Sequence, residues 1–471
     1  MTRALAKLLG DALATYPHGI ADGAGGSTAA ASLLGMAETM AGQLGEAGVV
    51  ADEPVAVRIG NRPADLAGLL AVWRAGAVAV PVHRNAAEAT VHTVFSRTGC
   101  RFAIDDGKLT ILSDAVPPVR PLLRDAALII FTSGSTGQPK GVVIGHEPFA
   151  KKLAVLNELL GLSPRDTVLL PLQLTFIFGI WVALLALMNQ SRLILISKFA
   201  PETLRPVLGD LSVFAGVPAM FRTLFSADIF QPAAGLRMVL TGGEMLGAGL
   251  SDKLVAAFPN AGVFDLYGLT ETGSCDFCLR PEERVAGLGS IGRPTGSVSF
   301  RIDRYDDSLP DGVGELLIRT PFGMAGYLDD PVLTAKSFDD GYFRTGDLAR
   351  VRPDGLVEIV GRSKDIVSRA GNKIAPAEID GWLMRHPSVA AALCAGVADA
   401  RLGEALHAVV VLREGCEANE QVLREWLAAR IERFKVPDVI RIVEALPVGA
   451  TGKALRAGVA ELTIAHDAIT G

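Results

Sequence analysis

The chain has 471 residues, of which 49% are hydrophobic and 20% are charged, and its 51 acidic and 45 basic residues leave a formal net charge of -6. A chain of this length forms roughly two to four modules and buries a large core. The slight negative charge and the absence of a basic block exclude nucleic acid as a partner.

The first element is expected at residues 1–19, where Arg3, Lys7 and Asp11 stand among apolar residues. These charges predict an amphipathic helix and not a signal peptide. The five cysteines are scattered and odd in number, which argues against a disulfide framework. We therefore expect a cytoplasmic protein with reduced thiols.

Strand-like and helical patterns then alternate. Residues 54–60, 62–76 and 77–82 read as strand, amphipathic helix and strand, which is typical of a βαβ unit on a parallel sheet. The pattern recurs at 193–197, 201–209 and 213–218, and again at 237–244 and 249–259. The first half of the chain therefore predicts an α/β fold.

Residues 167–191 contain no charge and are long enough to span a bilayer. Pro171, Gln173, Thr175 and Gly179 interrupt the first half of this stretch, and no basic cluster flanks it. A buried strand, a loop and a buried helix fit these residues better, so no membrane span is expected.

After Gly289, short strands separated by Gly, Asp and Pro turns predict a compact antiparallel β module. Beyond Arg362 the pattern returns to α+β. We therefore predict a large N-terminal domain (1–362) of βαβ subdomains plus a small β-barrel, followed by a small mobile α+β C-terminal domain (363–471).

A loop rich in small residues follows the apolar residues 129–132, in "IIFTSGSTGQPKGVVIG". Such a loop can point backbone N–H groups at an anion, and Lys140 would add a charge. It is not a Walker A loop, because the glycine spacing differs and Gly141 occupies the place of the Mg²⁺-binding Ser or Thr. By itself the loop could equally be a solvent-exposed turn.

Three further stretches contain residues suited to a nucleotide. "DLYGLTETGS" (265–274) offers an aromatic ring and a carboxylate that can hold a hard cation. The stretch 342–380 opens with "YFRTGDL", whose carboxylate can accept two hydrogen bonds from a ribose diol, and continues through "GRSKD…APAEI" at the expected boundary. "LPVGATGKALR" (446–456) places Lys453 in a Gly-flanked loop.

These four stretches, in this order, resemble the adenylate-forming superfamily, which includes acyl-CoA synthetases, aryl-acid ligases, peptide-synthetase adenylation domains and luciferases. The resemblance covers nearly the whole chain. It implies that a carboxylate attacks the α-phosphorus of ATP to give an acyl-adenylate and pyrophosphate, and that a thiol then displaces AMP. It implies ATP, Mg²⁺ and coenzyme A, or the phosphopantetheine arm of an acyl carrier protein, as cofactors and partners.

The resemblance also implies roles for single residues. The phosphate loop would consist of Thr132, Ser133, Gly134, Ser135, Thr136, Gly137 and Lys140. The adenine would lie against Gly242, Gly243, Glu244, Asp265 and Leu266, with Tyr267 stacked on it. Thr270 would contact the α-phosphate, Glu271 would hold Mg²⁺, and Asp347 with Arg362 would bind the ribose. Lys453 would bridge the carboxylate and α-phosphate, and Lys364 would be the hinge of the C-terminal domain.

The acid pocket departs from two patterns of the superfamily. Ile177 stands where peptide-synthetase domains carry the Asp that pairs with a substrate ammonium, and an unpaired buried ammonium would cost several kcal/mol. Phe176 stands where many CoA ligases carry a His. The resemblance implies an apolar pocket for a short or aromatic acid without an α-amino group, formed by Phe176, Ile177, Phe178, Trp181, Val239 and Thr241, with Leu266 beside them.

The leading hypothesis is an ATP-dependent, AMP-forming carboxylic acid–CoA ligase. One alternative is a stand-alone adenylation enzyme that loads an acid onto a carrier protein, and another is a catalytically inactive nucleotide-binding protein. Cys275 and Cys278 form a lone CxxC without a second pair, and two reduced thiols are favoured over a redox or zinc site.

Overall fold

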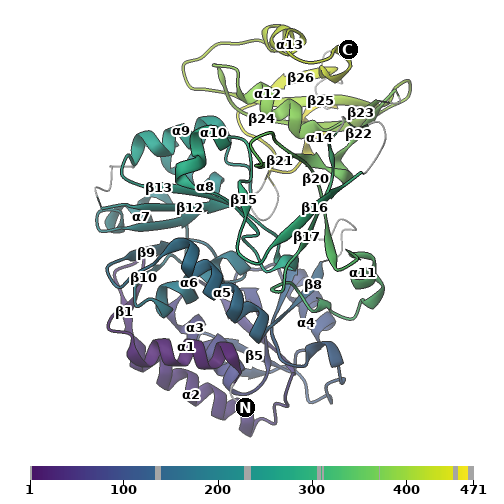
Figure 1. Ribbon diagram of the computed structural model, residues 1–471. Coiled ribbons are helices and arrows are strands. Elements are labelled where there is room, and N and C mark those ends of the chain that lie inside the picture. The colour runs from purple at the N-terminus through teal and green to yellow at the C-terminus, as the bar shows by residue number, and fades with distance from the viewer. Residues whose placement is uncertain are drawn as a thin grey trace.

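The computed structural model describes residues 3–132, 139–227, 235–304, 309, 312–370, 372–448 and 454–464. Figure 1 shows two layered sheet-and-helix units at the bottom and left, an antiparallel module beside them, and a small unit above. The predicted loop residues Ser133, Gly134, Ser135, Thr136 and Gly137, and the predicted catalytic Lys453, lie outside the described residues.

The first sheet has seven strands in the order β18, β8, β7, β4, β3, β5, β6. β3 and β4 are parallel neighbours, and α3 (Pro63–Arg74) connects them, which confirms the predicted βαβ unit. α4 (Glu88–Thr98) leads into β5. The strands are β3 (Pro54–Ile59), β4 (Val78–His83), β5 (Phe102–Asp105), β6 (Lys108–Ile111), β7 (Ala126–Thr132), β8 (Lys140–Gly145) and β18 (Gly326–Tyr327).

The second sheet has nine strands in the order β15, β14, β13, β12, β11, β9, β10, β1, β2. The five strands from β13 to β10 in this order are parallel, as the recurring strand–helix pattern predicts. The strands are β1 (Gly19–Asp22), β2 (Ser27–Ala29), β9 (Thr167–Leu170), β10 (Arg192–Leu195), β11 (Val213–Gly216), β12 (Met238–Gly242), β13 (Gly262–Tyr267), β14 (Phe277–Leu279) and β15 (Arg293–Pro294).

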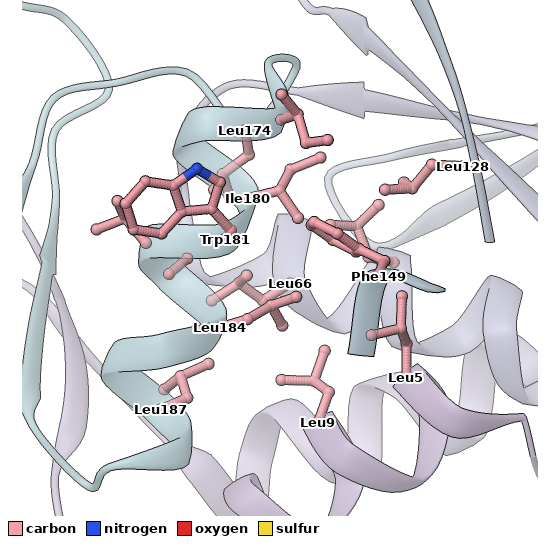
Figure 2. Packing of buried hydrophobic residues seen from close by; sticks show 14 of the residues in the cluster. Leu5, Leu9, Leu66, Leu128, Phe149, Leu174, Ile180, Trp181, Leu184 and Leu187 are labelled. Atoms are coloured by element: carbon pink, nitrogen blue, oxygen red, sulfur yellow. The ribbon is translucent and has the colours of Figure 1, made fainter. Parts of the chain in front are cut away.

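The largest core lies where helices pack between these two sheets. Figure 2 shows Leu5 and Leu9 of one helix, Phe149 of a second, and Trp181 and Leu184 of a third around the same apolar space. The helices are α1 (Ala4–Thr15), α2 (Ala30–Glu46), α5 (His146–Leu160) and α6 (Ile177–Met188), together with α3. α1 confirms the amphipathic helix expected near the N-terminus.

The uncharged stretch is a buried strand, β9, then a loop, then α6, which is buried almost all round and only 12 residues long. In the part of the chain that the structure describes, no helix combines the length and apolar character needed to cross a bilayer. The other face of the nine-stranded sheet has its own core, covered by α7 (Pro201–Leu204), α8 (Pro218–Ser226) and α9 (Ala248–Ala257).

The antiparallel module contains five strands, with β17 and β20 at its centre. The strand order is β16, β17, β20, β19, and β21 also pairs with β20. The strands are β16 (Ser299–Asp303), β17 (Gly314–Arg319), β19 (Phe338–Asp339), β20 (Tyr342–Val351) and β21 (Val357–Arg362). Two short helices flank the module, α10 (Arg284–Gly287) and α11 (Pro331–Lys336).

The C-terminal unit begins after β21, where the turn Ser363–Asp365 leads into a new sheet. This sheet has five strands and a separate apolar core, and Figure 1 shows it above the other sheets. Its strands are β22 (Val367–Arg369), β23 (Asn372–Ile374), β24 (Val389–Asp399), β25 (Gly403–Leu412) and β26 (Val439–Ile442), and its helices are α12 (Pro376–Met384), α13 (Glu420–Ala428) and α14 (Gly458–Ile464).

Candidate active site

The predicted adenine residues lie where the parallel strands β12 and β13 end side by side. Gly242 pairs with Leu266 across the two strands. A Cβ at Gly242 would lie 2.4 Å from the carbonyl oxygen of Leu266, and Gly243 has φ +82°, so both positions require glycine. Ligands of parallel α/β sheets bind at this carboxyl edge of the strands. Glu244, the next residue, forms a 3.2 Å ion pair with Arg222 of α8.

Three predicted residues meet directly. The hydroxyl of Tyr267 donates a 2.6 Å hydrogen bond to Oδ2 of Asp347, and Nε of Arg362 lies 2.7 Å from Oδ1 of the same carboxylate. The Asp347 side chain is only 4% exposed, whereas that of Arg362 is 49% exposed. The strands β13, β20 and β21 from two different sheets therefore bring together the residues predicted for adenine and ribose.

Asp265 is a second carboxyl group at this edge. It pairs with Thr241 across β12 and β13. Burial raises the pKa of Asp265 from 3.8 to about 7, because a low-dielectric environment disfavours the charged form. The hydroxyl of Thr241 is buried and has no hydrogen-bond partner among the described residues. The Thr241 hydroxyl and the Asp265 carboxyl, side by side at a ligand-binding edge, can bind the polar edge of a base.

The predicted magnesium residue Glu271 lies in the short turn Thr270–Thr272 that follows β13. Its Oε1 accepts a 3.1 Å hydrogen bond from Tyr327, and Oε2 has no partner in the described part of the chain. Nζ of Lys140 lies 5.3 Å from the centroid of the Tyr327 ring. An oxygen donor with one uncommitted atom fits Mg²⁺, which takes few protein ligands and completes its shell with water and phosphate oxygens.

Of the residues predicted for the phosphate loop, only Thr132 and Lys140 lie among the described residues. Thr132 is the last residue of β7, Lys140 is the first residue of β8, and the two are cross-strand partners. The loop between them therefore starts and finishes at one place on the seven-stranded sheet, and the cation at its end lies near Tyr327 and hence near Glu271.

The residues predicted for the acid pocket differ in exposure and do not all lie in the same core. Phe176 precedes α6 and is 48% exposed, whereas Ile177 and Trp181 are 5% and 1% exposed. The rings of Phe178 and Trp181 stack with centroids 5.1 Å apart. Ile177, Trp181 and Leu266 belong to the core between the two sheets, and Phe178 packs against it.

Val239 lies apart from the other predicted pocket residues. It is fully buried in the core on the opposite face of the nine-stranded sheet, with α8 and α9. Thr241 follows two residues later on the same strand and so points to the same side as Val239. Val239 therefore packs in a different core from Trp181, and Thr241 is the cross-strand partner of Asp265.

Three residues of this region were missed by the sequence reasoning: Lys152, Asp276 and Tyr327. Lys152 lies on the buried face of α5, beside Phe149 and Leu153. A charged residue on the apolar stripe of an amphipathic helix was a visible signal. Asp276 and Tyr327 had no comparable signal, because the charged residues that they contact, Lys152 and Glu271, lie far away along the chain.

The sequence matches the AMP-binding enzyme family over residues 13–328 and the AMP-binding enzyme C-terminal domain over residues 378–453. The chain belongs to the AMP-binding enzyme family. It is 34% identical to sulfoacetate–CoA ligase from Cupriavidus necator, over 73% of this chain and 68% of that protein. It is 30% identical to a feruloyl-CoA synthase from an Amycolatopsis species, over 93% and 95% of the two chains.

The fold matches that of ATP-bound MatB from Rhodopseudomonas palustris, with a TM-score of 0.85 and 26% identity over 99% of this chain and 100% of that one. The family and the names of its relatives identify the chain as an AMP-forming acid–CoA ligase. The predicted superfamily, fold class and enzyme class are thereby confirmed.

Proposed function

We propose that this ligase activates a short or aromatic carboxylic acid that lacks an α-amino group, with ATP bound at the carboxyl edge of β12 and β13. The observation that carries the proposal is the contact of Tyr267, Asp347 and Arg362, which lies one short turn from Glu271. Groups suited to base, ribose and phosphate thus follow one another along a single edge, in the order in which they occur in ATP.

In the first half-reaction a carboxylate oxygen of the acid forms a bond to the α-phosphorus, and the bond from that phosphorus to the bridging oxygen of pyrophosphate breaks. Asp347 accepts hydrogen bonds from the ribose hydroxyls and so fixes the nucleotide, while Tyr267 stacks on the base. Thr270 donates to the α-phosphate, and Lys140 compensates charge on the leaving pyrophosphate. Positioning and charge compensation of this kind account for most of the catalysis of such transfers.

A bound Mg²⁺ ion would neutralise charge on the phosphate oxygens, and Glu271 is the residue that would hold it. Its uncommitted Oε2 is available, and Tyr327 keeps the other oxygen in place.

Lys453 is proposed to bridge the attacking carboxylate and the α-phosphate. It lies outside the described residues, but Arg456, three positions later, is anchored firmly. Arg456 forms a 2.7 Å ion pair with Asp380 and lies 3.5 Å from Asp365, the neighbour of the proposed hinge Lys364. The chain just after Lys453 is therefore tied to the hinge, so that rotation of the 363–471 domain would carry Lys453 with it.

In the second half-reaction the thiol sulfur forms a bond to the acyl carbonyl carbon. The bond from that carbon to the bridging oxygen breaks, and this oxygen leaves with AMP. Coenzyme A is the proposed thiol. Rotation at Lys364 would withdraw Lys453 and admit the thiol while the reactive mixed anhydride stays protected from water.

The acid class rests on α6. Ile177, its first residue, is apolar and 5% exposed, so the helix offers no carboxylate to a substrate ammonium at this position. The relatives named above act on a sulfoacetate and on a feruloyl group, one short and one aromatic. Both agree with the proposed class.

Acid-dependent exchange of labelled pyrophosphate into ATP tests the proposal. The panel contains short, dicarboxylic, aromatic and α-amino acids. Exchange is expected with short or aromatic acids and not with α-amino acids. Nucleotide binding without exchange for any acid would instead support an inactive nucleotide-binding protein. Adding coenzyme A or a holo carrier protein to the best acid then separates the ligase from a carrier-loading enzyme, because only the correct thiol yields a thioester.

A further inference from the structure

A buried ion pair lies behind the turn that contains Thr270 and Glu271. Nζ of Lys152 and Oδ1 of Asp276 are 3.9 Å apart, and both side chains are 0% exposed. Taking two charges out of water costs several kcal/mol per ion, so a buried pair adds little net stability. Its main consequence is geometric, because each charge must stay with its partner.

The two charges hold separate parts of the turn. Nζ of Lys152 donates a 2.8 Å hydrogen bond to the carbonyl oxygen of Cys275 and lies 3.5 Å from the hydroxyl of Thr295. Oδ2 of Asp276 accepts a hydrogen bond from the hydroxyl of Thr272. The pair therefore connects α5 to the last residue of the Thr270–Thr272 turn and to the chain that follows it.

The backbone between these contacts is strained. Gly273, Ser274 and Cys275 have φ values of +85°, +69° and +48°. A left-handed conformation costs a residue other than glycine on the order of 1–2 kcal/mol and persists only where the surroundings enforce it. The hydrogen bond from Lys152 to the Cys275 carbonyl is one such constraint, placed at the last of the three residues.

The other side of the turn is fixed as well. The amide of Met324 donates a 2.8 Å hydrogen bond to the carbonyl oxygen of Glu271, and Tyr327 donates to its carboxylate. Glu271 is therefore held from the segment that leads into β18 of the seven-stranded sheet. Through Asp276, the turn is also held from α5. The direction in which the free oxygen of Glu271 points depends on both.

We propose that Lys152 and Asp276 are positioning residues for adenylate formation, which hold the 270–275 turn so that Thr270 meets the α-phosphate and Glu271 meets magnesium. The inference rests on the proposed roles of Thr270 and Glu271. Neither positioning residue touches substrate, since both are fully buried. Their effect on the reaction passes through the turn alone.

The main test is the double variant Lys152→Met, Asp276→Asn, which removes both charges and keeps an acceptor for Thr272. Its melting temperature is expected to stay close to that of the wild type, whereas Lys152→Met alone leaves an unpaired buried charge and is expected to melt earlier. In acid-dependent pyrophosphate exchange, the double variant should need about tenfold more Mg²⁺ or more for half-maximal rate, the scale found for residues that orient a metal ligand.

A second variant and a control accompany it. Thr272→Val keeps the volume of the side chain but removes the hydrogen bond to Asp276, and it is expected to shift the magnesium requirement in the same direction. Lys151→Met is the control, because Lys151 is the exposed neighbour on α5, with 62% of its side chain accessible. The KM for the acid should change by less than about twofold in all of these variants, since only the magnesium and phosphate contacts move.

The outcomes separate the possibilities. A double variant that melts like the wild type and keeps its magnesium requirement would overturn the proposal. A loss of stability together with a proportionate loss in every kinetic parameter, acid KM included, would overturn it too, by showing a purely structural role. If the double variant does not fold, the magnesium requirement of Thr272→Val tests the proposal, and an unchanged requirement would overturn it. A wild-type protein without acid-dependent exchange would contradict the proposed function itself.

Discussion

The hydroxyl of Tyr267 donates a 2.6 Å hydrogen bond to Asp347, although the two residues lie 80 positions apart in the chain. Tyr267 ends β13 of the nine-stranded sheet, and Asp347 lies within β20 of the antiparallel module. The bond therefore joins the side proposed for the base to the side proposed for the ribose, and two sheets share one nucleotide site.

Tyr267→Phe should weaken ATP binding without affecting the acid. The ring that stacks on adenine remains, but Asp347 loses one of its two partners. A hydrogen bond to a charged group contributes about 2 kcal/mol, so the KM for ATP is expected to rise by roughly tenfold or more. Tyr342→Phe, at the first residue of the strand β20 that also contains Asp347, serves as the control. An unchanged KM for ATP in Tyr267→Phe would contradict the proposed link.

Asp347→Asn tests the ribose contact. The change removes a charge-assisted acceptor and leaves Arg362 without its 2.7 Å partner. We expect kcat/KM for ATP to fall by about two orders of magnitude, because the hydrogen bonds from the ribose hydroxyls to a charged acceptor contribute about 1.5–3 kcal/mol each. The wild type should also discriminate against 2′-deoxy-ATP, and the variant should not. Equal discrimination by both proteins would show that Asp347 does not bind the ribose.

Lys453→Ala should impair only the first half-reaction. Acyl-adenylate formation is expected to drop by about two orders of magnitude, because one charge partner of the transition state is lost. Thioester formation from supplied acyl-adenylate should persist. Lys108→Ala, an exposed lysine of β6, is the control. Equal losses in both halves would show that the assigned role of Lys453 is wrong.

Lys364→Pro should have the opposite effect. Proline fixes φ and so restricts rotation at the proposed hinge. Pyrophosphate exchange is expected to stay within about threefold of the wild type, while thioester formation falls by about tenfold or more, the range in which hinge changes act on turnover. A selective loss of exchange would place the hinge elsewhere.

Asp265→Asn should change the pH dependence of stability. Burial raises the pKa of Asp265 from 3.8 to about 7, so between these values the folded protein binds more protons than the unfolded chain. The free energy of unfolding contributed by this group therefore falls as pH rises through that window. Asp265→Asn removes the penalty and is expected to be more stable than the wild type by about 4 kcal/mol near pH 8, where the wild-type carboxyl is ionised.

Near pH 4 the difference between Asp265→Asn and the wild type should vanish, because the carboxyl group is then neutral in the folded protein. Urea unfolding of both proteins at the two pH values measures it. Asp114→Asn, an exposed acid, provides the baseline. A stability difference that is independent of pH would contradict the raised pKa.

The individual helices and strands could be predicted from the sequence because apolar residues recur with a different spacing in each type of element. Residues 54–60, 62–76 and 77–82 became β3, α3 and β4 nearly as expected, since strand and helix patterns with short turns leave few alternatives. The motif residues Tyr267, Asp347 and Arg362 were also found, because the resemblance named them. Their hydrogen bond and ion pair required the fold.

The side on which a strand residue points was harder to predict. β12 is buried on both faces, so its residues are apolar in either direction and alternation carries no information about which core each enters. The sequence alone therefore did not show that Val239 packs in the core beside α8 and α9. Lys152 shows the converse, since its position on the apolar stripe of α5 marked it as unusual but did not reveal Asp276, 124 positions later, as its partner.

The most direct test of the account follows an oxygen atom. The best acid from the exchange panel is labelled with ¹⁸O in its carboxylate and is converted to the thioester with ATP and coenzyme A. Attack of the carboxylate on the α-phosphorus predicts one ¹⁸O atom in the AMP and none in the pyrophosphate, as mass spectrometry would show. Label in inorganic phosphate, or AMP without label, would contradict the acyl-adenylate mechanism.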